Sequence, residues 1–127
     1  MKTKPIVAWV FVVACLAVAA GVFATRFSAA LAHRRSVEAA AAHSAVLAQQ
    51  VRDDPRFAGI CFHAVSEDSR GVVVAHGAVD TEEASNALRE IAVASRPPVA
   101  VVGELRVGRP APGAPPPRRA WRIEAGR

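Results

Sequence analysis

The sequence predicts an α+β protein: a transmembrane helix and a helical stalk, then a small α-β-β-α-β two-layer domain, then a disordered tail rich in proline and arginine. Three observations support this. An apolar run, Ile6–Ala24, lies near the N-terminus. Alternating apolar segments flank one amphipathic segment further on, as in a sheet covered by helices. The last residues are rich in Pro, Gly and Arg, a composition that does not build a core.

The apolar run is long enough to cross a bilayer, which takes about 20 helical residues. Ile6–Ala24 contains no charged, amide or hydroxyl side chain. Backbone groups in lipid must be bonded within the segment, so a helix is expected. Trp9 lies near one end, where an indole can reach the interface. We therefore predict a transmembrane anchor over residues 1–26.

Three alternatives for this run stay open. Val22–Ala24 has the small residues of a signal-peptide cleavage site, although the apolar region of a signal peptide usually has about 7–15 residues. Val12–Cys15 resembles a lipobox, but the residues after Cys15 stay apolar. A buried core helix would need a larger core than the remaining residues can build.

Membrane orientation is not decided by the flanking charges, because basic residues stand on both sides: Lys2, Lys4, Arg26, Arg34 and Arg35. A short basic segment followed directly by a long apolar run is typical of a signal anchor. That interpretation would place the C-terminal part outside the cytosol.

The segment after the anchor is predicted to be helical. Residues 27–42 are rich in alanine and lack Gly and Pro, which favours a helix, and we interpret them as a stalk. The last turns, about His43–Arg52, are expected to pack on the following domain. Pro55 should end the helix, because the residue before a proline is disfavoured in the α region.

Residues 43–108 are predicted to form the domain. Gly59–Val65 and Val72–Val79 alternate as strands do, with Ile60, Phe62 and Ala64 on one face. The polar cluster Ser66–Gly71 should join them as an antiparallel hairpin.

A helix and a third strand should follow the hairpin. Asp80 is the predicted N-cap, with Glu83 completing a capping box. An apolar stripe then recurs at helical spacing: Ala84, Ala87, Leu88, Ile91 and Ala92. Pro97–Pro98 ends the helix, and Val99–Val107 is predicted as the third strand.

Residues 109–127 are predicted to be a disordered basic tail. The formal net charge of the chain is +5. Five arginines lie after Val107: Arg109, Arg118, Arg119, Arg122 and Arg127. Positive charge is therefore expected to be mainly a property of the tail.

No enzyme, metal, cofactor or nucleic-acid site is predicted. Cys61, His63 and His76 should share one sheet face, but a zinc site needs a fourth ligand and tighter spacing. The acidic pairs are explained by helix ends and by the turn, and no nucleophile–base set or phosphate-binding loop is present. Nucleic-acid binding is not favoured, because the sheet lacks interleaved aromatic residues.

From about Leu47 to Val107 the chain resembles a BON domain, over about half its length. Three runs carry the resemblance: VRDDPRF, GVVVAHGAV and PPVAVVGELRV. The residues that fit the motif are Gly71, Val73, Gly77, Val79, Val99, Val102, Leu105 and Val107. A glycine inside a strand marks a bulge or a close approach, and we expect the Ala84–Ala92 helix to press on Gly77. Ala75 departs from the pattern, where the family has a larger aliphatic residue.

The resemblance implies a non-enzymatic module of the bacterial envelope that binds phospholipid, envelope polymer or a protein partner. Together with the predicted signal anchor, this envelope location leads us to expect a single-pass protein of the bacterial inner membrane with its domain outside the cytosol. The alternative function is a structural subunit, because related α-β-β-α-β units build rings in secretion machinery. Val72, Val74 and His76 are expected on the solvent side of the sheet as a candidate partner face.

Overall fold

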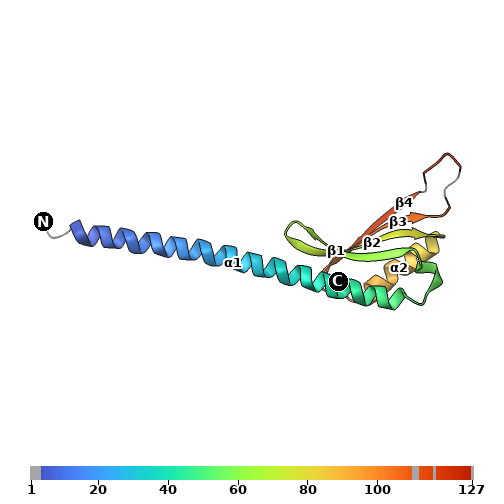
Figure 1. Ribbon diagram of the computed structural model, residues 1–127, viewed down its shortest axis with the longest axis horizontal. Helices are drawn as coiled ribbons and strands as arrows, with labels where there is room; N and C mark the ends of the chain where they lie inside the picture. Colours follow the sequence, from blue (N-terminus) through green and yellow to red (C-terminus); the bar gives the residue numbers. More distant parts are fainter. Residues whose placement is uncertain (1–3, 110–111, 116, 127) are drawn as a thin grey trace. The chain divides into compact units, whose positions relative to one another are not determined.

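The computed structural model describes residues 4–109, 112–115 and 117–126 (Figure 1). The chain forms two compact units, Met1–Ala32 and His33–Arg127. The α+β class is confirmed. The order of elements is α1 (Lys4–Val51), η1 (Pro55–Phe57), β1 (Ile60–Glu67), β2 (Arg70–Val79), α2 (Glu82–Ala94), β3 (Ala100–Val107) and β4 (Arg118–Ile123).

Helix α1 is continuous over 48 residues. Its only proline, Pro5, stands in the first turn, where the missing N–H costs nothing. Among the residues that the structure describes, α1 is the one helix long and apolar enough to cross a membrane. It ends at Val51, and Asp54 caps the following η1 turn by accepting a hydrogen bond from the Arg56 amide, so the predicted stop before Pro55 is confirmed.

The C-terminal part of α1 packs on the sheet. Ala40, Leu47 and Val51 are buried there. The amide of Gly71 donates a hydrogen bond of 2.6 Å to Ser36 Oγ, and a Cβ on Gly71 would overlap the backbone of Ser36. Helix and sheet therefore meet already within residues 27–42, the segment that the sequence predicts as a stalk.

The sheet has four strands in the order β1-β2-β3-β4. β1 and β2 are antiparallel, β2 and β3 are parallel, and β3 and β4 are antiparallel. The β1–β2 turn is shorter than predicted, because Glu67 already pairs with Arg70. Asp68 and Ser69 form it with φ of 49° and 62°, the positive values that a two-residue type I′ turn requires. Helix α2 makes the crossover between the parallel strands.

Both helices contribute to a core on one side of the sheet (Figure 1). One cluster joins the end of α1 and η1 to α2, β2 and β3: Val51, Phe57, Ala75, Val79, Ala84, Leu88, Leu105 and Val107. The other cluster joins α1, α2 and three strands: Ala40, Leu47, Val73, Ala92, Val99, Val101 and Ile123. Ile60, Phe62 and Ala64 pack against these clusters, so the prediction that they share one face is confirmed.

The N-cap of α2 is Thr81 and not Asp80. Thr81 Oγ1 accepts a hydrogen bond of 3.1 Å from the Ala84 amide. The helix thus begins one residue later than predicted. Glu83 then falls at the second helical position, and the predicted capping box with Asp80 does not form.

The predicted tail contains a strand, so the prediction of disorder is wrong for Arg118–Ile123. This segment pairs with β3 as β4. Trp121 and Ile123 flank the exposed Arg122 and face the core: Trp121 packs over Gly103, and Ile123 is buried. The arginines and prolines of this region led us to predict disorder. The segment forms a strand because it can pair with β3. The same prediction for residues 110–111, 116 and 127 lies outside the described residues.

Candidate functional site: the open face of the sheet

The side of the sheet opposite the helices is the candidate site, and we call it the open face. Alternate strand residues point to each side, and Val73, Ala75 and Val79 of β2 belong to the core. The open face therefore consists of alternate residues of each strand, beginning with Cys61, Arg70, Ala100 and Arg118.

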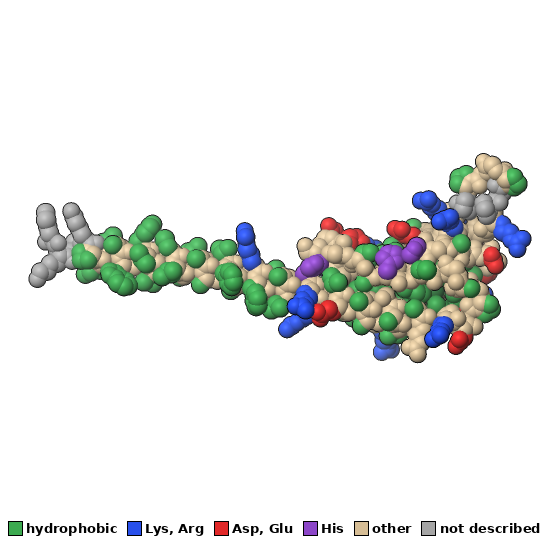
Figure 2. Space-filling model, viewed as in Figure 1, with side chains coloured by type: hydrophobic (Ala, Val, Ile, Leu, Met, Phe, Trp, Pro, Cys, Tyr) green, Lys and Arg blue, Asp and Glu red, His purple; other side chains and the backbone are tan. Residues whose placement is uncertain are grey.

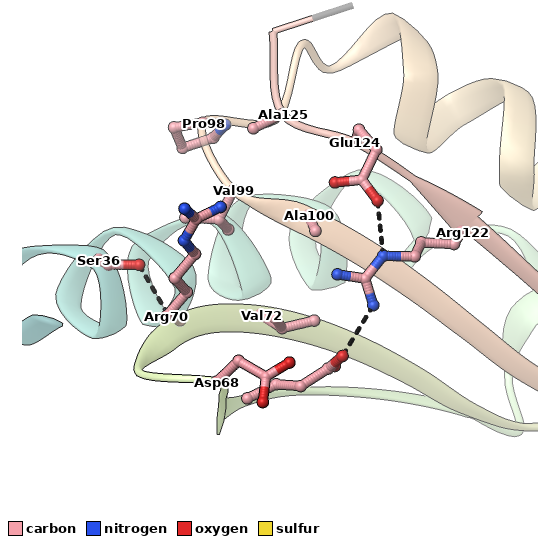
Figure 3. Close-up of a pocket in the computed structure, with 12 residues that line it drawn as sticks. Ser36, Asp68, Arg70, Val72, Pro98, Val99, Ala100, Arg122, Glu124 and Ala125 are labelled. Atoms are coloured by element: carbon pink, nitrogen blue, oxygen red, sulfur yellow. Dashed lines mark hydrogen bonds and ion pairs between the residues drawn. The ribbon is translucent and has the colours of Figure 1, made fainter.

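The expected partner residues are not equally exposed on this face. Val72 is only 2% exposed, so its predicted exposure is wrong. Val74 is half-buried, and His76 is exposed. Val72 stands in register between Val65 and Ala100, below side chains that reach across the sheet from its two edges (Figure 3).

Those side chains form a charged bridge at one end of the open face. Arg122 Nη1 of β4 donates a hydrogen bond of 3.0 Å to Glu67 Oε1 of β1, and Arg122 Nε donates one of 2.7 Å to Glu124 Oε1 (Figure 3). The bonds to Glu124 and Glu67 raise the pKa of Arg122. Arg122 thus links both edge strands across the sheet.

A hollow of about 500 Å³ lies beside this bridge. Its wall contains Arg70 and Arg122 against three acidic residues, Glu67, Asp68 and Glu124 (Figure 3). The bridge already occupies one guanidinium and two of the carboxylates. These nearly balanced charges do not favour an ion of either sign.

Two histidines lie together in the middle of the open face. The rings of His63 and His76 are 4.7 Å apart between centroids, in an edge-to-face arrangement. Figure 2 shows histidine side chains grouped over β1 and β2. Cys61 stands opposite His76 in register, so all three share one face, as expected. Within the described part of the chain, no three His, Cys, Asp or Glu side chains are arranged to hold a metal ion.

The motif residues occupy mixed environments. Val102 is half-buried on the open face, whereas five others are buried in the core: Val73, Val79, Val99, Leu105 and Val107. Gly71 approaches α1. Gly77 has φ of 139°, and a Cβ there would overlap the carbonyl of Gly59. The chain segment against Gly77 is therefore the residue before β1, and not the α2 helix that we expected.

One polar contact inside the domain was not predicted from the sequence. His43 of α1 is 8% exposed, and its Nε2 lies 2.9 Å from Ser95 Oγ, at the end of α2. Ser95 Oγ donates its hydrogen to the Ala92 carbonyl at 2.6 Å, so Nε2 of His43 is the donor to Ser95. Burial lowers the pKa of His43. This histidine joins the two helices and lies away from the open face.

Comparison of the chain with protein-family models, with curated proteins and with solved structures finds no match.

Proposed function

We propose that the chain is a single-pass membrane protein of the bacterial envelope whose second unit is a non-catalytic, BON-like binding module outside the cytosol. The observation that carries the anchor is the exposure of its apolar side chains. The twelve large ones from Ile6 to Phe27 are 50–73% exposed. Burying each fully is worth about 1.5 kcal/mol or more, so leaving them in water forgoes on the order of 20 kcal/mol. Lipid offers that burial.

The binding role of the second unit is supported by its layout. Its core lies on the helix side of the sheet, and the open face carries hollows of about 500 and 460 Å³ at its two ends. Phospholipid, an envelope polymer or an envelope protein are the ligands that we consider.

Alkaline carbonate extraction of membranes tests the anchor. The full-length protein should stay in the pellet, and a variant with Val13→Arg and Leu16→Arg should be released, because charges at the bilayer centre are costly. A wild-type protein that stays soluble without detergent, with its first residues attached, contradicts the proposal. For topology, Ala125→Cys in a background with Cys15→Ala and Cys61→Ala should react with an impermeant maleimide in intact cells. Reaction only after lysis would contradict an extracytoplasmic domain.

A second candidate function, a subunit of a homo-oligomeric assembly, is favoured by β1. This edge strand pairs with β2 alone. It contains no Pro, Lys or Arg, and its one charged residue is Glu67 at the end. Natural edge strands usually carry Lys, Pro or other charged residues that prevent them from pairing with strands of other chains.

Light scattering on the detergent-solubilised full chain tests this candidate. A large oligomer should become a monomer with His63→Lys on β1, and should persist with Ala78→Lys on β2, which is exposed but not on an edge. A monomeric wild-type protein rejects the assembly.

A further inference from the structure

Two arginines face each other at the far end of the open face. Arg106 of β3 and Arg118 of β4 are direct partners in the antiparallel register. Both are exposed. Arg106 stands between the core residues Leu105 and Val107, which places it and its register partner Arg118 on the open face. Side chains paired in this way have Cβ atoms about 4.5–5.5 Å apart, and like charges at this position destabilise the sheet.

The described surroundings do not neutralise this pair. The ion pairs among the described residues use four other arginines: Arg34, Arg56, Arg119 and Arg122. The acidic residue nearest in register on the open face is Glu104, and neither arginine forms an ion pair with it. Its one carboxylate could balance only one of the two guanidinium groups. The site therefore retains at least one positive charge more than its own side chains balance.

A hollow of about 460 Å³ opens beside the pair. Arg106, Arg118 and Glu104 line it together with His76, and Ala120 adds apolar surface. Arg119 also lines it, but its guanidinium is engaged by Glu82 at 3.1 Å. Figure 2 shows basic side chains around the base of the β3–β4 hairpin. The hollow can hold an anionic group and part of the molecule attached to it.

We propose that Arg106 and Arg118 form a binding site for a phosphate group. This inference rests on the proposed function of the second unit as a binding module, and it specifies that the ligand carries a phosphate group. Guanidinium groups bind phosphate through paired N–H donors, and such charge-assisted bonds are about twice as strong as neutral ones. A phosphate group offers several acceptor oxygens, so both arginines can be bound at once. The ligand then removes the repulsion between the two arginines on neighbouring strands.

Titration of the full chain in phosphatidylcholine nanodiscs at low ionic strength tests the site, with inorganic pyrophosphate as the added anion. Calorimetry should show saturable binding. The double variant Arg106→Gln and Arg118→Gln should bind at least about tenfold more weakly, because it loses two charged hydrogen-bond donors. Arg89→Gln on α2 is the matched control: Arg89 is exposed and in no described ion pair, and its loss should leave binding unchanged.

Thermal unfolding of the same samples gives an independent readout. Without added anion, Arg118→Gln should raise the melting temperature of the domain, because the repulsion disappears, whereas Arg89→Gln should not. Pyrophosphate should raise the melting temperature of the wild type and not of the double variant. A melting temperature that is not lowered shows that the double variant is folded.

A lipid headgroup and a soluble phosphate are separated by repeating the measurement in nanodiscs that contain phosphatidylglycerol. If the melting temperature rises in these nanodiscs but not with pyrophosphate, and the rise needs both arginines, the ligand is the headgroup. If it rises with pyrophosphate but not in these nanodiscs, the ligand is a soluble phosphate. Equal behaviour of wild type and double variant with both anions overturns the site. Carbonate extraction of the same proteins reports the anchor separately, so loss of the site and loss of the proposed membrane attachment are distinguishable.

Discussion

The contact between Gly103 and Trp121 holds β4 on the sheet, and its disruption can be worked out from the structure. A Cβ on Gly103 would overlap the six-membered part of the Trp121 indole. That neighbour is a side chain, so it can move, but only by leaving the core clusters that it packs against. Gly103→Ala is therefore expected to displace the indole and to loosen β4.

The magnitude follows from the packing. An added methyl group in a packed site usually costs about 1–3 kcal/mol. Replacing a fully buried Trp by Ala costs about 3–5 kcal/mol. Trp121 is only half-buried, so we expect about 2–3 kcal/mol for Trp121→Ala. Without the indole, the new methyl group meets no obstacle. Gly103→Ala should then cost less than about 0.5 kcal/mol in the Trp121→Ala background.

Urea denaturation followed by far-ultraviolet circular dichroism measures these values. The fragment from Ala32 to the C-terminus is suitable, because it contains every residue of both core clusters. The expected result is a coupling free energy of about 1–3 kcal/mol between the two substitutions. An equal cost of Gly103→Ala in both backgrounds would refute the idea that the indole fills the space above Gly103.

Three further predictions concern stability of the same fragment. Thr81→Ala should lower the free energy of unfolding by about 1 kcal/mol through loss of the α2 cap. Asp80→Ala should change it by less than about 0.5 kcal/mol. A larger loss with Asp80→Ala than with Thr81→Ala would show that Asp80 is the cap. The folded pKa of His43 lies below its ordinary 6.5, so the unfolded state binds the proton first and stability should fall as pH drops below about 6.5. The fall is at most about 1.4 kcal/mol per pH unit and should be smaller in His43→Gln; equal pH profiles would exclude this role. Gly71→Ala should cost at least about 2 kcal/mol, because its Cβ meets helix backbone; rescue by Ser36→Ala would show that the obstacle is the side chain.

Local patterns in the sequence were sufficient for the elements that depend on a residue's own neighbours. The apolar run in α1 is unbroken and long enough to span a bilayer. The alternation in β1 and β2 and the stripe on α2 repeat at the period of the element they form. The stop of α1 before Pro55 follows from a steric rule that acts on adjacent residues. These features could be predicted because the interactions that produce them lie within a few residues of each other.

The candidate site depended on contacts that no local pattern contains. In β4, three of the six residues are arginines, and the segment becomes a strand only because β3 supplies hydrogen bonds and Gly103 leaves room for Trp121. Val72 was expected in solvent, but the Arg122–Glu67 bridge spans the face on which it lies. The glycine at Gly77 accommodates the carbonyl of Gly59, which sequence periodicity could not show.

The amino-acid sequence by itself determined which segments are helices and which form the first three strands, since backbone propensity and hydrophobic period act locally. The tertiary structure alone decided that Arg106 and Arg118 stand opposite each other, that His43 reaches Ser95, and that β4 closes the sheet. Each of these depends on strand register or helix packing, which brings together residues that are distant in the chain or set apart by a loop. The interactions between these residues stabilise or destabilise the protein only after folding has brought the partners into contact.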